Sequence, residues 1–175
     1  MGLDMYLRKS PKFLDDPKRN EAVIDFVNWI RSGYDCTFRQ WCEESSENLP
    51  DIQTIVKFIE SFPSESFDEE VAYWRKVNAI HGWFVKNVQN DIDDCGQHRP
   101  VTKKDLEELR DLCSRVLANH SLAPELLPVT PGFFFGLYDY DDWYFEKLKY
   151  TVEICDRLLE ETDFERYELY YHSSW

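Results

Sequence analysis

The chain lacks any long hydrophobic run. None of its stretches approaches the roughly 18 consecutive apolar residues that mark a membrane-spanning helix. The opening MGLDMYLRKS lacks the basic and then apolar order of a signal peptide, and Tyr6 stands where the myristoylation pattern requires Ser or Thr. We therefore expect a cytoplasmic protein with neither a membrane-spanning segment nor a lipid anchor.

The sequence also lacks a cysteine pattern typical of disulfide-bonded proteins. The chain has five cysteines, an odd number, and they are widely scattered. Three of them fall on predicted apolar helix faces. This pattern is typical of reduced, buried thiols in a cytosolic protein and does not indicate a disulfide framework. The cysteines are Cys36, Cys42, Cys95, Cys113 and Cys155.

Motifs for catalysis and for phosphate binding are absent. The chain contains no G-x-S-x-G sequence and no cysteine in a recognisable nucleophile context. The segment 132–136, GFFFG, is the nearest approach to a glycine-rich loop, but it lacks lysine and is too hydrophobic. A nucleotide could still be held by basic side chains and aromatic stacking. We predict no cofactor and favour a protein that is not an enzyme.

Two partial metal motifs lie close together. The stretch 91–96 supplies the first positions of an EF-hand calcium loop, but Thr102 stands where the bidentate carboxylate belongs. Cys95 and His98 form a C-x-x-H pair, whereas a structural zinc site needs four ligands, usually in two close pairs. A distant ligand such as Cys113 remains open. We predict that the protein binds no metal.

Negative charge is concentrated in two blocks. The net charge is −14; residues 43–70 hold nine acids and one base, and residues 139–168 hold eleven acids and four bases. Such a chain repels phosphates, which excludes non-specific nucleic-acid binding. The blocks could meet a basic partner protein, or they could be solvated surfaces that keep the protein soluble. The candidate partner-binding residues are Glu43, Glu44, Glu47, Asp139, Asp141 and Asp142.

The composition predicts one compact domain over residues 1–175. Hydrophobic residues make up 43% of the chain and aromatic residues 16%, enough for one sizeable core. Apolar residues alternate at 3–7 and at 167–171, which predicts a strand at each end of the chain. We expect these strands to pair with each other, with 133–135, or with both. The predicted fold is mainly α within the α+β class: a compact multi-helix domain with a small antiparallel sheet formed by the N- and C-terminal segments.

Helical patterns fill most of the remaining chain. Thr102 and Asp105 form an approximate capping box at the start of one helix. Acids at 139–142 begin the last long helix, where negative charge favours the helix start. The predicted helices cover about 18–32, 38–42, 50–61, 70–95, 102–116 and 139–159.

The predicted helix from Glu70 to Cys95 carries the best candidate site. Its core stripe contains residues such as Ile80 and Phe84, and the side with Arg75, Ala79, Gly82 and Lys86 should face water. Between the core stripe and the water-facing side lies a narrow border with a carboxylate, an indole, an amide and an imidazole. The candidate ligand-binding residues of this border are Glu70, Trp74, Asn78 and His81.

Three roles are open for this border. His81 could act as a general acid–base, Trp74 could stack on a ring, and Asn78 could read an amide or a base edge. Alternatively, the polar groups could bond to buried backbone nearby, for example at the ends of the 132–136 segment. A histidine beside an apolar stripe is more often such a structural residue.

Several segments together resemble a group of small phage and prophage proteins. The matching strings are MGLDMYL at the start, YWRKVNAIHGWFVKNVQ followed by DDC, LLP, GFFFG, and YYHSSW at the end. The resemblance covers most of the chain. It implies a viral accessory protein in a bacterial host cytoplasm, but it assigns no activity and no catalytic residue.

Three functions therefore compete. The first is an accessory protein that binds and inhibits or sequesters a host component, such as a defence protein, through acidic surfaces that mimic nucleic acid. The second is a binding protein for a small, nucleotide-like molecule, with its pocket at Trp74, Asn78 and His81. The third is an enzyme that uses His81 as acid–base. We favour the first, because acidic blocks are present and catalytic motifs are not.

Overall fold

The structure is a computed structural model that describes residues 2–13, 23, 57, 61, 69–93, 95, 98–132, 135–136 and 139–175. The helices predicted at 18–32, 38–42 and 50–61 lie outside the described residues except for single positions, and Glu43, Glu44 and Glu47 lie outside them entirely. The prediction of one domain over 1–175 therefore stays a prediction.

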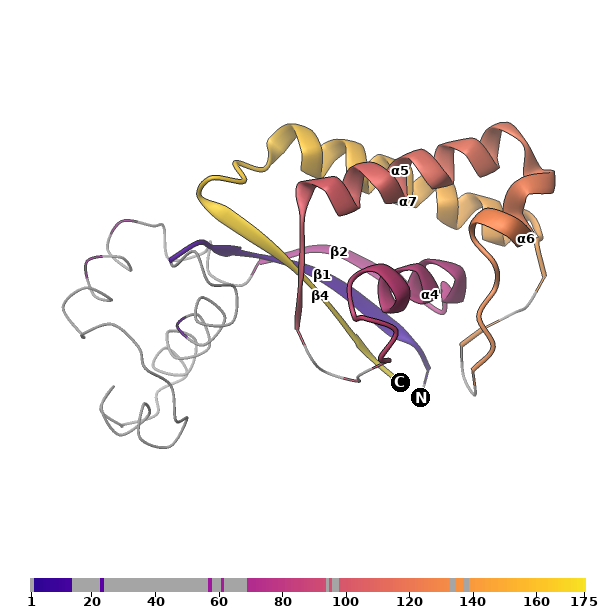
Figure 1. Ribbon diagram of the computed structural model, residues 1–175, viewed down its shortest axis with the longest axis horizontal. Coiled ribbons are helices and arrows are strands. Elements are labelled where there is room, and N and C mark those ends of the chain that lie inside the picture. The colour runs from indigo at the N-terminus through magenta and orange to yellow at the C-terminus, as the bar shows by residue number, and fades with distance from the viewer. Residues whose placement is uncertain are drawn as a thin grey trace.

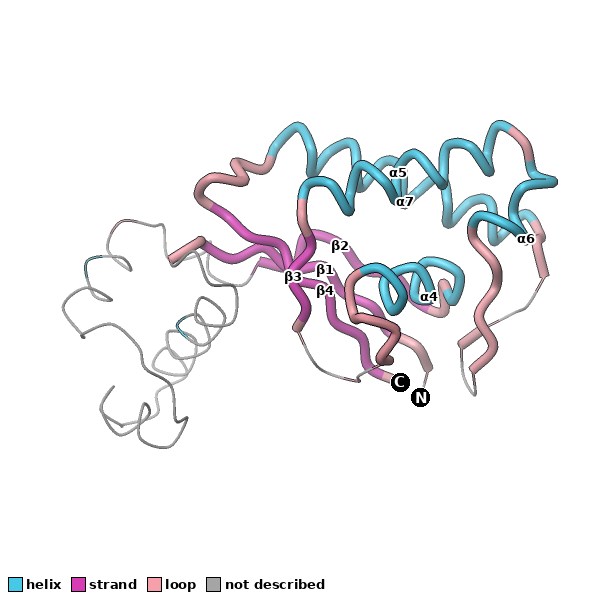
Figure 2. Tube along the Cα trace, viewed as in Figure 1, coloured by secondary structure: helices cyan, strands magenta, loops and turns pink. Residues whose placement is uncertain are grey.

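The described residues build a four-stranded antiparallel sheet in the order β2-β1-β4-β3 (Figures 1 and 2). The central pair joins the two ends of the chain, with a register that runs from Asp4 opposite Ser174 to Pro11 opposite Tyr167. The predicted strands at both ends are thus confirmed, and the two termini lie side by side (Figure 1). The strands are β1 (Asp4–Pro11), β2 (Glu69–Arg75), β3 (Arg99–Val101) and β4 (Tyr167–Ser174).

The predicted sheet was wrong in one respect, because two internal segments also contribute strands. β2 and β3 flank the central pair, so the sheet is not formed by the terminal segments alone. The described residues of the 132–136 segment, by contrast, lie in no strand. The described residues therefore form an α+β fold, with a larger sheet than the sequence indicated.

The single helix predicted over 70–95 is also wrong. Its first part is β2, and only α4 (Asn78–Asn87) is helical. Trp74 of β2 lies opposite Met5 of β1, and the valine and aromatic residues of β2 favour a strand once a partner strand is available. Lys76 ends the strand with a φ of 57°, and its N–H donates to the Leu3 carbonyl at 2.8 Å.

The backbone conformation at position 136 requires glycine. Its φ is 105°, a left-handed conformation that side chains rarely adopt. A Cβ atom at this position would also lie 2.7 Å from the Lys76 carbonyl oxygen. The backbone of Gly136 therefore packs directly against Lys76, in the turn that connects β2 to α4.

Two long helices form a second layer. α5 (Lys103–Ala118) begins with the predicted capping box, in which Thr102 and Asp105 each satisfy a backbone N–H of the other. A 3-10 turn, η2 (His120–Leu122), and a short helix, α6 (Ala123–Leu126), lead away from it. The chain then returns as α7 (Asp142–Glu161), which lies beside α5 (Figure 1).

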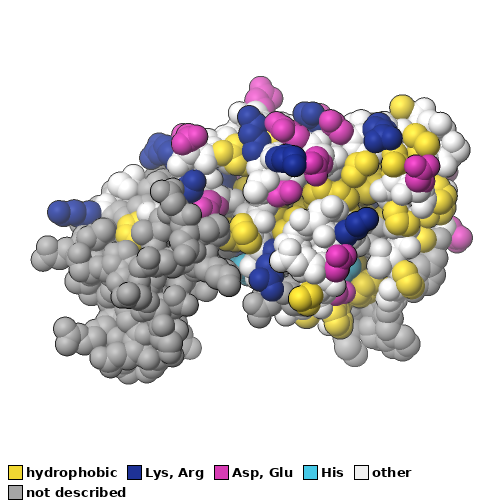
Figure 3. Space-filling view, viewed as in Figure 1, with side chains coloured by type: hydrophobic (Ala, Val, Ile, Leu, Met, Phe, Trp, Pro, Cys, Tyr) yellow, Lys and Arg dark blue, Asp and Glu magenta, His cyan; other side chains and the backbone are white. Residues whose placement is uncertain are grey.

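The core lies between one face of the sheet and the helices. Four residues of one face of α5 are buried, namely Leu106, Leu109, Cys113 and Val116, and so are Leu148 and Leu158 of α7. α4 covers the same sheet face, where the ring of Phe84 stacks on that of Tyr171 with centroids 3.9 Å apart. On the surface shown in Figure 3, charges of both signs cover the long helices, and hydrophobic side chains gather between α5 and α4. None of the described helices is both long enough and apolar enough to cross a membrane.

Candidate functional site

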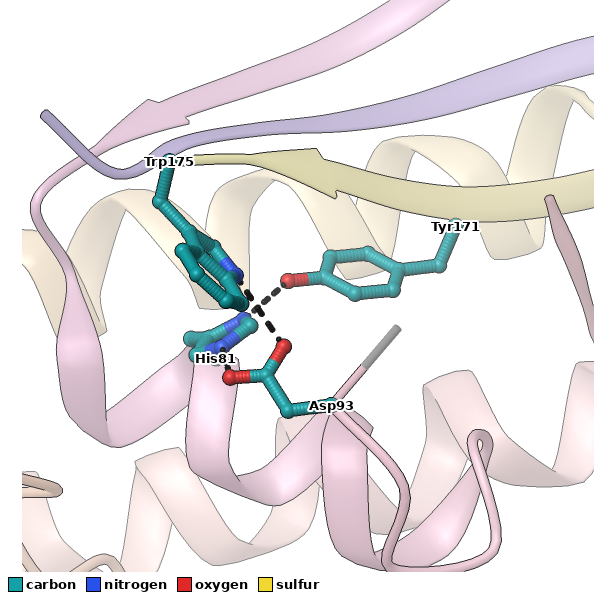
Figure 4. Close-up of polar contacts among 4 residues, drawn as sticks. All are labelled: His81, Asp93, Tyr171 and Trp175. Atoms are coloured by element: carbon teal, nitrogen blue, oxygen red, sulfur yellow. Dashed lines mark hydrogen bonds and ion pairs between the residues drawn. The ribbon is translucent and has the colours of Figure 1, made fainter. Parts of the chain in front are cut away.

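His81 lies at the centre of a buried polar cluster. Its side chain is fully inaccessible to solvent, although it comes from the helix face beside the core stripe. Nδ1 lies 2.8 Å from the Tyr171 hydroxyl, and Nε2 lies 3.1 Å from Asp93 Oδ2 (Figure 4). Each ring nitrogen of His81 is therefore within hydrogen-bonding distance of another side chain.

The cluster joins three parts of the fold. His81 belongs to α4, Tyr171 to β4, and Asp93 to the turn after α4. The Trp175 indole N–H donates to the other Asp93 oxygen at 3.2 Å, and Phe135 lies edge-on to the His81 ring with centroids 5.1 Å apart. We call His81, Asp93, Tyr171 and Trp175 the His81 cluster.

The donor and acceptor capacities of the three side chains determine which atoms of Asp93, His81 and Tyr171 carry protons. An ionised carboxylate only accepts hydrogen bonds, so neutral His81 donates a hydrogen bond from Nε2 to Asp93 and accepts one from the Tyr171 hydroxyl at Nδ1. Burial lowers the pKa of His81 below its usual 6.5, although the hydrogen bond to Asp93 opposes this effect. Burial also raises the pKa of Tyr171 well above 10. Both rings are therefore neutral at neutral pH.

A chain of Asp93, His81 and Tyr171 resembles an acid–base relay, but its geometry favours a structural role. A general base needs a nitrogen within reach of the substrate proton. Both nitrogens of His81 already face protein groups, and its side chain has no exposed surface. The cluster holds α4 and the turn after it against β4.

The other three border residues do not join His81 in one pocket. Glu70 lies on β2 with Oε2 3.8 Å from Nη1 of Arg8, and its side chain is 47% exposed. Trp74 is buried and donates from Nε1 to the Thr151 hydroxyl of α7 at 3.0 Å. Asn78 is buried too, and its Oδ1 accepts the backbone N–H of Thr130 at 3.4 Å.

The predicted border assumes one continuous helix, and the strand geometry of β2 removes Glu70 and Trp74 from it. On α4 itself the helical wheel also failed for Ala79, which was expected to face water but is only 3% exposed. Asn78 does bond to nearby backbone, although its partner Thr130 is only half-buried. The sequence offered no signal for the partners of His81, since Tyr171 lies 90 residues away.

The thiols and the partial metal motifs give no second site. Across the described stretches, no three His, Cys, Asp or Glu side chains gather as a metal site would require. Cys113 and Cys155 are free and buried in the helical layer, and Cys95 is free and exposed. Burial raises the pKa of Cys155 to about 12 and that of Cys113 further still, so both thiols stay protonated and unreactive.

The acids at 139–142 have different environments. Asp141 is the N-cap of α7, and its side chain accepts the N–H of Tyr144 at 2.9 Å. Asp139 and Asp142 are exposed. The interpretation of these acids as a helix start is confirmed for Asp141, and the partner-binding role of all three stays a prediction.

One outward face of α7 continues from Asp142 and was not singled out from the sequence. Along it, acids recur at helical spacing beside two aromatic side chains, Trp143 and Tyr150, which are 36% and 40% exposed. The Lys147 ammonium lies between them, 5.5 Å from the Trp143 ring and 5.8 Å from the Tyr150 ring. We define the α7 face as Asp142, Trp143, Glu146, Lys147, Tyr150, Glu153 and Glu160. Two further exposed bases lie on the same side of the helix: Lys149, and Arg157, whose Nη1 is 3.7 Å from Glu161 Oε2.

Comparisons with protein-family models, with curated proteins and with solved structures found no match to this chain.

Proposed function

We propose that the protein is a phage- or prophage-type accessory protein that binds a basic surface of a host component through the α7 face and thereby inhibits or sequesters that component. The observation that carries this proposal is the combination of exposed acids and exposed aromatic rings on one helix face. Neither feature alone would indicate a binding surface.

The acids of the α7 face are available for a partner. Asp142, Glu146, Glu153 and Glu160 are exposed, and none of them forms an ion pair with another described residue. By contrast, Asp156 on the same helix lies 3.7 Å from Arg110 of α5. Unpaired acids of one sign steer a basic partner toward the surface and raise the association rate.

Trp143 and Tyr150 provide the apolar part of this surface. Large aromatic side chains dominate the binding energy of protein interfaces when a partner buries them. They lie seven residues apart, two turns of one helix, so a single partner surface can cover both. The Lys147 ammonium lies 5.5 Å and 5.8 Å from the two ring centroids, and the two aromatic residues are still 36% and 40% exposed.

The length of the charged face suits an elongated basic groove. From Asp142 to Glu160 the helix rises about 27 Å, at roughly 1.5 Å per residue. A nucleic-acid-binding groove offers positive charge over such a length, so competition with nucleic acid is the strongest form of the proposal. The proposed location is the cytoplasm of a bacterial host, which the free thiols of Cys113 and Cys155 support.

The alternative of a nucleotide-like ligand at Trp74, Asn78 and His81 has less support. All three side chains are buried, and each forms a hydrogen bond within the protein. A ligand would have to displace these contacts before it could bind. The described geometry therefore favours the surface of α7.

Neutralising the acids tests the proposal. The variant Asp142→Asn, Glu146→Gln, Glu153→Gln should recover the host partner poorly from a bacterial lysate at low salt, because its long-range attraction is weakened. Recovery by the wild-type protein should also fall steeply as salt is raised, since exposed charges are screened within about 8 Å at physiological ionic strength. The measurement is affinity capture, followed by mass spectrometry of proteins and small molecules.

A matched control removes the same charge elsewhere. The variant Glu108→Gln, Asp163→Asn, Glu165→Gln neutralises three exposed acids outside the α7 face. It should recover the partner as the wild-type protein does. Equal losses in both variants would show that net charge matters and the α7 face does not, and capture that is insensitive to salt would refute the electrostatic form of the proposal.

A further inference from the structure

A groove separates α4 from α6 and the segment that follows it. It has a volume of about 230 Å³. Hydrophobic side chains gather in this region of the surface, between α5 and α4 (Figure 3). Trp83 of α4, Leu112 of α5 and Leu127 after α6 contribute to its lining, together with Lys86 and Glu125.

Several contacts hold the outer wall of this groove in place. The Tyr144 hydroxyl donates to the Leu127 carbonyl at 2.7 Å, and the Thr130 N–H donates to Asn78 at 3.4 Å. Gly82 of α4 lies so close to Thr130 that a side chain there would collide with the threonine. The wall is therefore fixed before any ligand arrives, which lowers the entropic cost of binding.

The groove carries one charge of each sign. Lys86, in the last turn of α4, and Glu125, on α6, both line it and both are exposed. They form no ion pair with each other or with any other described residue. A molecule in the groove could therefore meet an ammonium group and a carboxylate that have no ion-pair partner in the described structure.

The size of the groove restricts the ligand. A cavity of about 150 Å³ accepts benzene, and pockets for drug-sized ligands begin at about 300 Å³. A volume of about 230 Å³ lies between these values. It suits one ring or branched alkyl group together with a short polar portion.

We propose that this groove binds a small zwitterion with an apolar side chain, the chemical class of the free hydrophobic amino acids. The ligand carboxylate pairs with Lys86, the ligand ammonium pairs with Glu125, and the apolar side chain lies against Trp83 and the half-buried Leu112. This site is separate from the α7 face, so its test does not depend on the partner-binding proposal.

Three probes that differ only in their charged groups test the site: L-phenylalanine, 3-phenylpropionate and phenethylamine. Titrations are followed by calorimetry and by the NMR signal of the Trp83 indole N–H. L-Phenylalanine should bind most tightly. Lys86→Met should weaken the binding of L-phenylalanine and of 3-phenylpropionate about fivefold and leave the binding of phenethylamine unchanged. Glu125→Gln should weaken the binding of L-phenylalanine and of phenethylamine about fivefold and leave the binding of 3-phenylpropionate unchanged.

Both substituted side chains are exposed, so the variants should fold as the wild-type protein does. Lys104→Met and Glu108→Gln, which change an exposed ion pair on α5 outside the groove, serve as controls and should bind all three probes normally. The proposal is overturned if no probe gives saturable binding up to its solubility limit. It is equally overturned if binding occurs but does not follow this charge pattern across the two groove variants.

Discussion

Replacing His81 with alanine should lower the free energy of unfolding by about 3 kcal/mol. The substitution leaves a cavity in a fully buried position and removes the partner of the Tyr171 hydroxyl, which then has to stay buried without its acceptor. The measurement is urea unfolding at neutral pH. His120→Ala, which changes an exposed histidine, should cost less than about 1 kcal/mol and serves as the control.

The pH dependence of stability distinguishes this role from simple packing. Burial holds the pKa of His81 in the folded protein below the 6.5 of an unfolded chain. As the pH falls below 6.5, the unfolded chain therefore binds a proton that the folded protein does not. The contribution of His81 to stability is complete above this pH and declines below it. His81→Ala should remove this decline, and an unchanged pH profile with little loss of stability would contradict a structural His81.

Replacing both Trp143 and Tyr150 with alanine should raise the dissociation constant for the host partner at least about tenfold. Exposed aromatic residues that become buried at an interface commonly contribute more than 1 kcal/mol each. The measurement is a binding titration with the partner recovered by affinity capture. Stability should change little, because both side chains are substantially exposed in the free protein.

Trp175 and Ile92 give the matched control for this prediction. They are 49% and 62% exposed, and neither belongs to the α7 face. Trp175→Ala with Ile92→Ala should bind the partner with wild-type affinity. If this control pair loses affinity and the α7 pair does not, the partner binds near the His81 cluster instead.

Local sequence was sufficient to predict those elements whose characteristic residue pattern lies within the element itself. The alternation of Leu3, Met5 and Leu7 predicted β1, and the capping box at Thr102 predicted the start of α5. In both places the pattern lies within one element, so no knowledge of distant partners is required. β4 is confirmed as a strand too, but its burial does not alternate along its length, because Leu169, Tyr170 and Tyr171 are all buried.

The elements that were predicted wrongly are strands that form through pairing with distant segments. The segment 70–75 fits a helical wheel, but its pairing with β1 makes it a strand, and that pairing spans more than sixty residues. β3 contains only three residues, one of them Pro100, which is too short a run to produce a periodic signal. Strand pairing depends on the rest of the chain, so local periodicity could not identify either strand.

The candidate site shows the same limit. His81 is an unusual residue in the sequence, but its role depends on Tyr171 and Asp93, which the fold brings to its two ring nitrogens. The acids of 139–168 were recognised as a charged block. Which of these acids are unpaired, and that Trp143 and Tyr150 stay partly exposed beside them, depends on how α7 packs against α5.

Hydroxyl-radical footprinting of the protein, free and bound to its captured host partner, tests most directly whether α7 carries the function. Oxidation of exposed side chains is measured by mass spectrometry with and without the partner. We predict protection of Trp143 and Tyr150 and unchanged oxidation of Trp175 and Ile92. Protection of Trp175, with Trp143 and Tyr150 still oxidised, would contradict the account and place the binding site beside His81.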